Sequence, residues 1–427
     1  MKNKFIKSTL ILIIGGFITK ILGMIIKIIM TRNISNEAIG MYMLILPTYN
    51  LFITLVSAGM QVSISKLISE NKISKRKIMN TALKISAILG IIIVILILIL
   101  SKPISYILHN KDLYIPILSM LLSIPFIGIS SVLKGYLFGQ NKMHAQVISN
   151  FIEQIIRIIM FIIILPKINN NIEAVTFIIG SNIINESLSV FILSLFIEKK
   201  DFHINEFKID TFTKEEILST SIPFTSSRLI GTISYFFEPI LITNLLLMNG
   251  YSSKFVTTEY GIITGYSMQL LLLPSFFSMA ISQSIIPLIS NAYINRRYNY
   301  IKKKIKEIIL LSFLIGLIYI IILNINPKYF MNLIYNTNQG IKYLKIMSPI
   351  FILLYVQSPL TSILQSINKS KESMKSTIEG IIIKTLLMII LSFMHFGMYS
   401  LIIPMLVNII YVTIHNYIVI KKSINSF

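Results

Sequence analysis

Long apolar stretches recur along the whole of this sequence, and they limit its fold more than any other feature. The clearest stretch, residues 88–100, reads ILGIIIVILILIL and has no polar side chain. A helix needs about 20 apolar residues to cross the hydrocarbon core of a bilayer. The candidate spans are 8–31, 39–66, 80–101, 113–137, 145–166, 173–197, 217–248, 260–291, 308–325, 341–367, 376–395 and 398–420. The sequence therefore predicts an all-α, polytopic membrane protein with about 12 transmembrane helices.

The composition excludes a soluble enzyme. Of the 427 residues, 54% are hydrophobic and only 13% are charged, about half the charged fraction of a soluble protein. Twelve crossings of about 20 residues also leave no room for a sizeable soluble domain. Cysteine is absent, which excludes disulfides and thiolate metal sites, and we expect no metal.

The net charge of +22 is carried mostly between the apolar stretches. Anionic lipid headgroups are therefore the expected partners, and no nucleic acid is expected. With the N-terminus in the cytoplasm, most lysines and arginines fall on the cytoplasmic side, as the positive-inside rule requires. An even number of spans then predicts that both the N- and C-termini are cytoplasmic.

The longest hydrophilic stretch, 198–216, divides the chain into two halves of six spans. We predict an N-terminal lobe over 1–200, a cytoplasmic linker over 201–216 and a C-terminal lobe over 217–427. Two weak similarities recur in the same order in both halves. The segment from Gly40 resembles the segment from Gly261, and Asn141-Lys142 resembles Asn368-Lys369. Unless they are chance similarities between isoleucine-rich helices, they predict a pseudo-two-fold axis along the membrane normal and a central cavity.

Four residues of the first span form a stripe on one helix face: Gly16, Lys20, Gly23 and Lys27. We call these residues the cationic stripe. An ionisable group at this depth costs several kcal/mol and suggests a function, here a cationic cavity wall for an anionic substrate. The alternatives are an ion pair between Lys20 and a structural carboxylate, and snorkelling of Lys27 to the outer interface.

Other charges and several prolines lie inside the predicted spans. Glu153 and Arg157 are spaced for an ion pair within one helix, which is the alternative to a role in gating. Arg228 and Glu238 lie in the seventh span, where Pro239 frees a carbonyl beside the carboxylate that could bind Na⁺ or a proton. Transporter helices are often broken at proline, and the candidate breaks are Pro47, Pro239, Pro274 and Pro287.

Motifs for catalysis are absent. The sequence has no G-x-x-x-x-G-K-[ST] loop and no H-E-x-x-H motif. We therefore expect no enzyme and no cofactor, and favour transport, with Na⁺ or a proton as the coupling ion. A membrane glycosyltransferase or polymerase is the less favoured alternative, because it would need a large external loop.

Several stretches resemble the stage V sporulation protein B group. They are the first two spans, the segment KGYLFGQNKMHAQVISNFIEQIIR at 134–157, SRLIGTISYFFEPILI from residue 227 and the segment from residue 260. The group belongs to a superfamily of multidrug extruders, oligosaccharidyl-lipid flippases and lipid II flippases. The resemblance implies two six-helix lobes around an alternating-access cavity. It also implies export of a lipid-linked glycan.

In the lipid II flippases, a basic residue precedes a Leu-Gly pair in the first helix. Lys20 in the segment TKILG matches that position, and Arg32 matches a later basic residue. The family's other cavity arginines have no clear counterpart in this chain.

The sequence thus predicts a monomeric flippase of the bacterial cytoplasmic membrane. Its cargo would be an undecaprenyl-linked saccharide, a peptidoglycan or polysaccharide precursor. The predicted substrate contacts are Lys20, Gly23, Lys27 and Arg32. The predicted gate or ion-coupling residues are Glu153, Arg157, Arg228 and Glu238. A cation-coupled multidrug exporter of the same fold is the main alternative.

Overall fold

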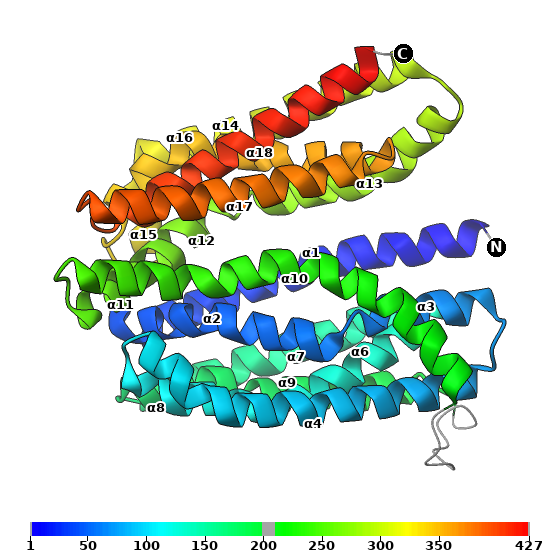
Figure 1. Cartoon of the computed structure of the whole chain (residues 1–427), viewed down its shortest axis with the longest axis horizontal. Coiled ribbons are helices and arrows are strands. Elements are labelled where there is room, and N and C mark those ends of the chain that lie inside the picture. The colour runs from blue at the N-terminus through cyan, green and yellow to red at the C-terminus, as the bar shows by residue number, and fades with distance from the viewer. Residues whose placement is uncertain (1, 199–209, 426–427) are drawn as a thin grey trace. The chain divides into compact units, whose positions relative to one another are not determined.

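The computed structural model describes residues 2–198 and 210–425, and this part of the chain contains helices and no strand (Figure 1). The first half consists of α1 (Lys2–Asn33), α2 (Asn36–Ser57), α3 (Met60–Glu70), α4 (Lys75–Ile107), η1 (Lys111–Leu113), α5 (Tyr114–Ser119), η2 (Met120–Leu122), α6 (Ile124–Gly139), α7 (Met143–Ile164), η3 (Leu165–Lys167), α8 (Asn171–Gly180) and α9 (Asn182–Leu195). The second half consists of α10 (Thr211–Met248), α11 (Ser253–Gly261), the π-helix η5 (Ile262–Ser267), α12 (Met268–Leu271), α13 (Ser275–Ile294), α14 (Tyr298–Ile325), α15 (Pro327–Tyr335), α16 (Ile341–Ser366), α17 (Ser370–Phe393) and α18 (Tyr399–Asn425).

The structure confirms an all-α, polytopic membrane protein. Among the described residues, nine helical segments are long and apolar enough to cross a membrane. The number is ten if the pair 111–122 and 124–139, bent by 40°, counts as one span. The remaining two predicted spans, 8–31 and 260–291, correspond to α1 and to the series from α11 to α13. On α4, Ile91 and Ile99 are each 62% exposed, as expected for side chains that face lipid.

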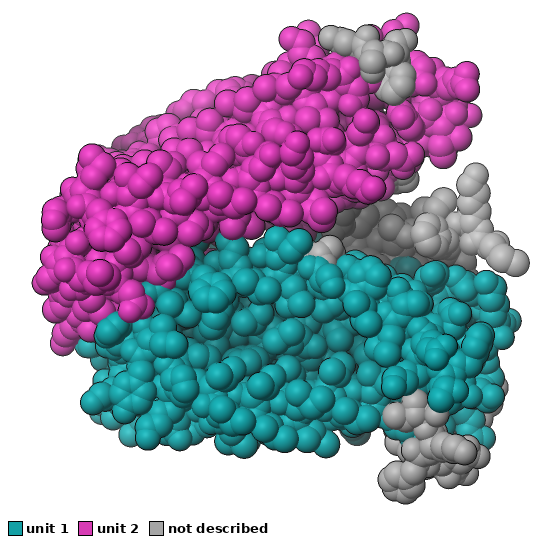
Figure 2. Space-filling view, in the orientation of Figure 1, with its two compact units in different colours: residues 1–240 teal, residues 241–427 magenta. Residues whose placement is uncertain are grey.

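The chain forms two compact units, Met1–Ile240 and Leu241–Phe427, which Figure 2 draws in teal and magenta. The boundary lies inside α10 rather than in the hydrophilic stretch, because the first part of α10 packs on unit 1. Ser63 donates a hydrogen bond of 2.8 Å to the carbonyl of Ile217. The lobe boundaries 1–200, 201–216 and 217–427 stay a prediction.

Asp210 begins α10 by capping it. Its carboxylate accepts hydrogen bonds from the Thr213 hydroxyl and from the Thr213 backbone amide, the latter at 3.0 Å. These hydrogen bonds, helped by Lys77 at 3.9 Å, lower the pKa of Asp210 from its ordinary value.

The second predicted span is interrupted at Ala58 and Gly59, where no proline stands. Both residues have left-handed backbone conformations, with φ of 40° and 63°, and they separate α2 from α3. A Cβ on Gly59 would lie 3.0 Å from the side chains of Phe224 and Thr225 on α10. Glycine therefore permits both the turn and the close approach of α10.

The repeat inferred from Asn141-Lys142 and Asn368-Lys369 has a structural counterpart. Both asparagines are left-handed, with φ of 59° and 60°. The amides of the following lysines donate back to Leu137 and Leu364 at 2.9 and 2.8 Å. The helices α6 and α16 thus end in the same type of C-terminal cap, and α7 and α17 follow at equivalent positions.

Candidate functional site

The cationic stripe follows one face of α1 over about three turns. Lys20 and Lys27 are exposed. A Cβ added to Gly16 or Gly23 would meet no atom within 4 Å. The stripe therefore leaves open space beside two ammonium groups.

The packing of α1 against α7 fixes the direction of this face. Gly15 lies against Val147, where a Cβ would come within 2.2 Å of a methyl group. Ile26 and Met30 are buried in a cluster with Phe161 of α7. The exposed side of α1 beyond the stripe carries the large apolar residues Ile18, Ile21 and Ile25.

Lys20 forms no ion pair with any carboxylate in the described part of the chain. The alternative that Lys20 serves a structural ion pair therefore finds no support in residues 2–198 and 210–425. Lys27 lies close enough to Lys20 for their charges to interact. Arg32 is in the last turn of α1 and is exposed.

Arg157 of α7 is held by two asparagines of α9. Its Nη2 donates to Asn182 Oδ1 at 2.5 Å. With the Asn185 amide turned so that its oxygen faces the guanidinium, this oxygen accepts from Nε and Nη2 at 2.7 and 2.8 Å. In the same orientation, the Asn185 nitrogen donates to the carbonyl of Glu153 at 3.2 Å. The guanidinium thus has neutral partners that hold its position without cancelling its charge.

The ion pair that the spacing of Glu153 and Arg157 allows does not form. Glu153 instead accepts a hydrogen bond of 2.6 Å from Ser149, whose hydroxyl lies 3.1 Å from that of Ser189. Nearby on α9, Glu186 accepts a hydrogen bond of 2.9 Å from Ser130 of α6. Unit 1 therefore holds three charged side chains among neutral hydrogen-bonding partners.

The other predicted gate residues lie on α10. Arg228 is exposed and Glu238 is partly buried, within electrostatic reach of Tyr235. The ten residues between them span about 15 Å of helix, too far for a direct ion pair. The structure does not bring them together.

The prolines differ in their effect on the helices. Helix α2 continues through Pro47, and α10 continues through Pro239. Pro274 lies at the junction between α12 and α13. Pro287 is within α13, but its side chain lies outside the described part of the structure.

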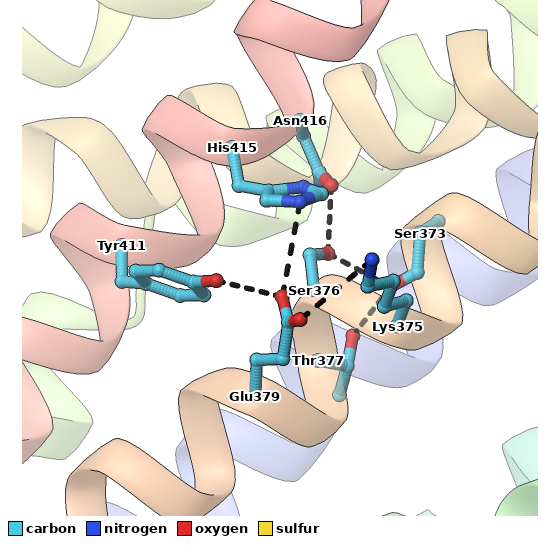
Figure 3. A network of polar contacts seen from close by, with 8 residues as sticks. All are labelled: Ser373, Lys375, Ser376, Thr377, Glu379, Tyr411, His415 and Asn416. Carbon is cyan, nitrogen blue, oxygen red and sulfur yellow. Dashed lines mark hydrogen bonds and ion pairs between the residues drawn. The ribbon is translucent and has the colours of Figure 1, made fainter.

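Unit 2 contains a polar network between α17 and α18 (Figure 3). Glu379 accepts a hydrogen bond of 2.6 Å from Tyr411, and His415 Nε2 lies 3.8 Å from the same carboxylate oxygen. Ser376 donates to Asn416 at 2.8 Å. No three His, Cys, Asp or Glu side chains of the described residues gather as metal ligands. Sequence analysis assigned no role to Glu379 or His415, although a histidine within a long apolar stretch was a usable signal.

The family of this chain follows from its sequence as a whole. A family model described as polysaccharide biosynthesis protein matches residues 5–293, more than half of the chain. The chain belongs to the polysaccharide biosynthesis protein family. A second family model, MatE, matches residues 263–394.

Two proteins of Bacillus subtilis (strain 168) illustrate the range of relatives. The chain is similar to stage V sporulation protein B, with 32% identity over 92% of this chain and 78% of that protein. It is also similar to the lipid II flippase MurJ, with 23% identity over 91% of this chain and 77% of that protein. One of these two relatives is thus named as a flippase.

Solved structures agree on the fold. A multidrug resistance MATE family transporter of the MOP superfamily, in its inward-facing conformation, matches with a TM-score of 0.76 and 14% identity over 96% of this chain and 95% of that one. A MOP superfamily transporter from Pyrococcus furiosus with reversed binding-pocket polarity matches with a TM-score of 0.66 and 13% identity over 100% and 96% of the two chains. This chain is therefore a multi-pass membrane protein with the fold of the MOP superfamily.

Proposed function

We propose that this family member flips an undecaprenyl-linked saccharide, a peptidoglycan or polysaccharide precursor, from the cytoplasmic to the outer leaflet by alternating access. The observation that carries the proposal is the cationic stripe, with Lys20 free of any ion pair to a described carboxylate and open space at Gly16 and Gly23. The similarity to the lipid II flippase MurJ supports the same class of cargo.

The physical problem is to carry a polar, anionic headgroup across about 30 Å of hydrocarbon. In water, the diphosphate is stabilised by hydration and counter-ions. Fixed ammonium groups at Lys20 and Lys27 would replace both along the path, and Arg32 would extend the cationic surface by one turn. Gly23 leaves room for the headgroup to approach the helix backbone. The lipid tail would stay in the bilayer.

The remaining charged residues would control the cycle. Arg157 is held in place by neutral partners and keeps its positive charge, while Glu153 lies one turn before it on α7. Arg228 and Glu238 lie on α10, the helix that joins the two units. We assign these four residues to gating or to coupling with Na⁺ or a proton.

The proposed setting is the bacterial cytoplasmic membrane, with both termini in the cytoplasm and a monomer as the working form. The distribution of lysine and arginine between the spans supports this orientation. The same basic turns would bind anionic lipids.

Native mass spectrometry of the protein extracted from its own membrane into lipid nanodiscs tests the proposal. Wild type should carry an undecaprenyl diphosphate glycan, and Lys20→Ala should lose it, since a headgroup phosphate would lose its ammonium partner. Lys20→Arg should retain the glycan. Lys102→Ala on α4 removes an exposed lysine away from the stripe and should also retain it.

The second candidate is a cation-coupled multidrug exporter, which the MatE match over residues 263–394 favours. Bulk phospholipid alone on wild type and variants would contradict the flippase and favour this candidate. A drug-susceptibility panel on an overexpressing strain would then test it.

A further inference from the structure

None of the residues assigned to cargo binding belongs to the network around Glu379 in unit 2. We call Lys375, Glu379, Tyr411 and His415 the Glu379 network. The four side chains come from facing positions on α17 and α18 (Figure 3). Glu379 is at the centre, with 34% of its side chain exposed. Each of the other three residues places a polar atom within 4.0 Å of its carboxylate.

Close packing of the two helices brings these groups together. A Cβ on Gly380 would lie 2.3 Å from Asn408 Oδ1 and 2.7 Å from a methyl group of Val412. Only a residue without a side chain fits at this position unless its neighbours move. Glu379, one residue earlier, is therefore carried into contact with α18.

A second layer one turn away holds the helices in register. Ser376 donates to Asn416, and the buried Asn416 amide donates to Thr361 of α16 at 3.4 Å. Ser376 and Asn416 lie at the same offset of 227 residues from Ser149 and Ser189, the hydroxyl pair of unit 1. The layer is thus a structural contact that both repeats share, whereas at the same offset Glu379 and His415 correspond to the apolar residues Ile152 and Leu188.

His415 approaches Glu379 without forming a hydrogen bond to it. Its Nε2 lies 3.8 Å from Glu379 Oε2, which is beyond hydrogen-bond range, and its Nδ1 is buried without a partner among the described residues. Only 23% of the side chain is exposed. A proton on Nε2 would turn this loose contact into a charge-assisted hydrogen bond after a movement of about 1 Å.

The other charged and polar groups near the pair come from α16, α17 and α18. Lys375 Nζ lies 4.0 Å from Glu379 Oε1 and is 63% exposed, so its charge is partly screened. Tyr411 supplies a neutral donor. The polar side chain that α16 contributes nearby is Thr361, which is neutral. The lysines of α16, Lys342 and Lys345, lie in its first turns. On α17, Glu372 lies about two turns before Glu379, and Lys384 lies more than one turn after it.

We propose that Glu379 and His415 together form a proton-binding site in unit 2. Glu379 lies about 14 Å along α17 from its beginning, less than one turn into the predicted span 376–395. Histidine is the side chain whose charge ordinarily changes between pH 5 and 8, so the site would respond to a physiological proton gradient. Proton binding would tighten α17 on α18. Its use in driving transport rests on the proposed function, whereas the binding of the proton does not.

The proton site is tested by nuclear magnetic resonance of ¹⁵N-histidine in the full-length protein in liposomes, between pH 5 and 8. The signal absent in His415→Gln identifies this imidazole among the five histidines. The His415 imidazole should change from neutral to protonated in this range. In Glu379→Gln, its protonated fraction should be smaller at each pH. Glu372→Gln, two turns away on α17, is the matched control and should leave the signal unchanged. A His415 signal that stays neutral to pH 5, or that does not respond to Glu379→Gln, overturns the proposal.

The coupling role is tested in proteoliposomes with a fluorescent undecaprenyl diphosphate disaccharide as the probe. An imposed pH gradient should change the flipping rate several-fold in wild type and in Glu372→Gln, and this response should be lost in His415→Gln and Glu379→Gln. An equal response in His415→Gln overturns the coupling. Failure of wild type to flip the probe overturns the proposed function instead, while the resonance experiment still decides whether the proton site exists.

Discussion

At the scale of single residues, the chain treats its intramembrane charges in two ways. Arg157, Glu153 and Glu379 each have neutral hydrogen-bonding partners from their own or a neighbouring helix. Lys20, in contrast, forms no ion pair with any of the described carboxylates and stands beside open space. The first group is positioned by the fold, whereas Lys20 offers its charge to something outside the chain.

The hydrogen bonds to Arg157 make a prediction about stability. Asn185→Leu removes an acceptor from a partly buried guanidinium and should lower the free energy of unfolding by about 1–3 kcal/mol. Thermal unfolding in detergent would measure the loss. The double variant Asn185→Leu with Arg157→Met should cost less than the sum of the single changes, because it leaves no donor unsatisfied. Additive losses would show that the two side chains do not interact.

The sequence predicted some of these residue-level features. The spacing of Lys20 and Lys27 placed them on one face, because helical periodicity alone determines that relation. The interpretation of Glu153 and Arg157 as an ion pair was wrong, since the choice of partner depends on which helix packs alongside. The asparagines of α9, 25 and 28 residues further along the chain than Arg157, could not be matched to it by spacing within α7.

At the scale of helices, hydropathy predicted where the chain is apolar enough to cross a membrane but not where the helices break. The break between α2 and α3 falls at Ala58 and Gly59 rather than at Pro47. Proline in a spanning helix is tolerated when neighbours satisfy the freed carbonyl. A left-handed alanine is favoured only by tertiary contacts, here the packing of α10, and leaves no signal in the local sequence.

The close packing of α17 on α18 gives a prediction at this scale. Gly380→Ala should lower the unfolding temperature, because the added methyl group would overlap Asn408 and Val412, and overpacking of this kind costs about 1–3 kcal/mol. Gly16→Ala is the control, since its Cβ would meet no atom within 4 Å and alanine favours the helix. Thermal unfolding of both variants in the same detergent would compare them. Equal behaviour would contradict the tight contact.

At the scale of the whole chain, the two halves repeat one construction. Helices α6 and α16 end in the same cap, and Ser149 with Ser189 corresponds to Ser376 with Asn416 at the same offset. The shared contacts are those that hold helices together. The charged groups differ between halves, with Glu153 standing where the second half has Gly380. One architecture thus presents different chemistry in each unit.

The repeat and the charge distribution together predict the membrane topology. Because the chain has no cysteine, single introduced cysteines can be labelled without background. Lys75→Cys and Lys302→Cys lie at equivalent exposed positions of the two repeats, at the first residue of α4 and early in α14. Both should react with a membrane-impermeant maleimide only after cells are opened. Lys111→Cys and Lys328→Cys follow these spans and should react on intact cells. Because six spans return the chain to the side where it began, the two repeats must share one orientation. Labelling of Lys75→Cys and Lys302→Cys from opposite sides would therefore contradict both the twelve-span topology and a pseudo-two-fold axis along the membrane normal.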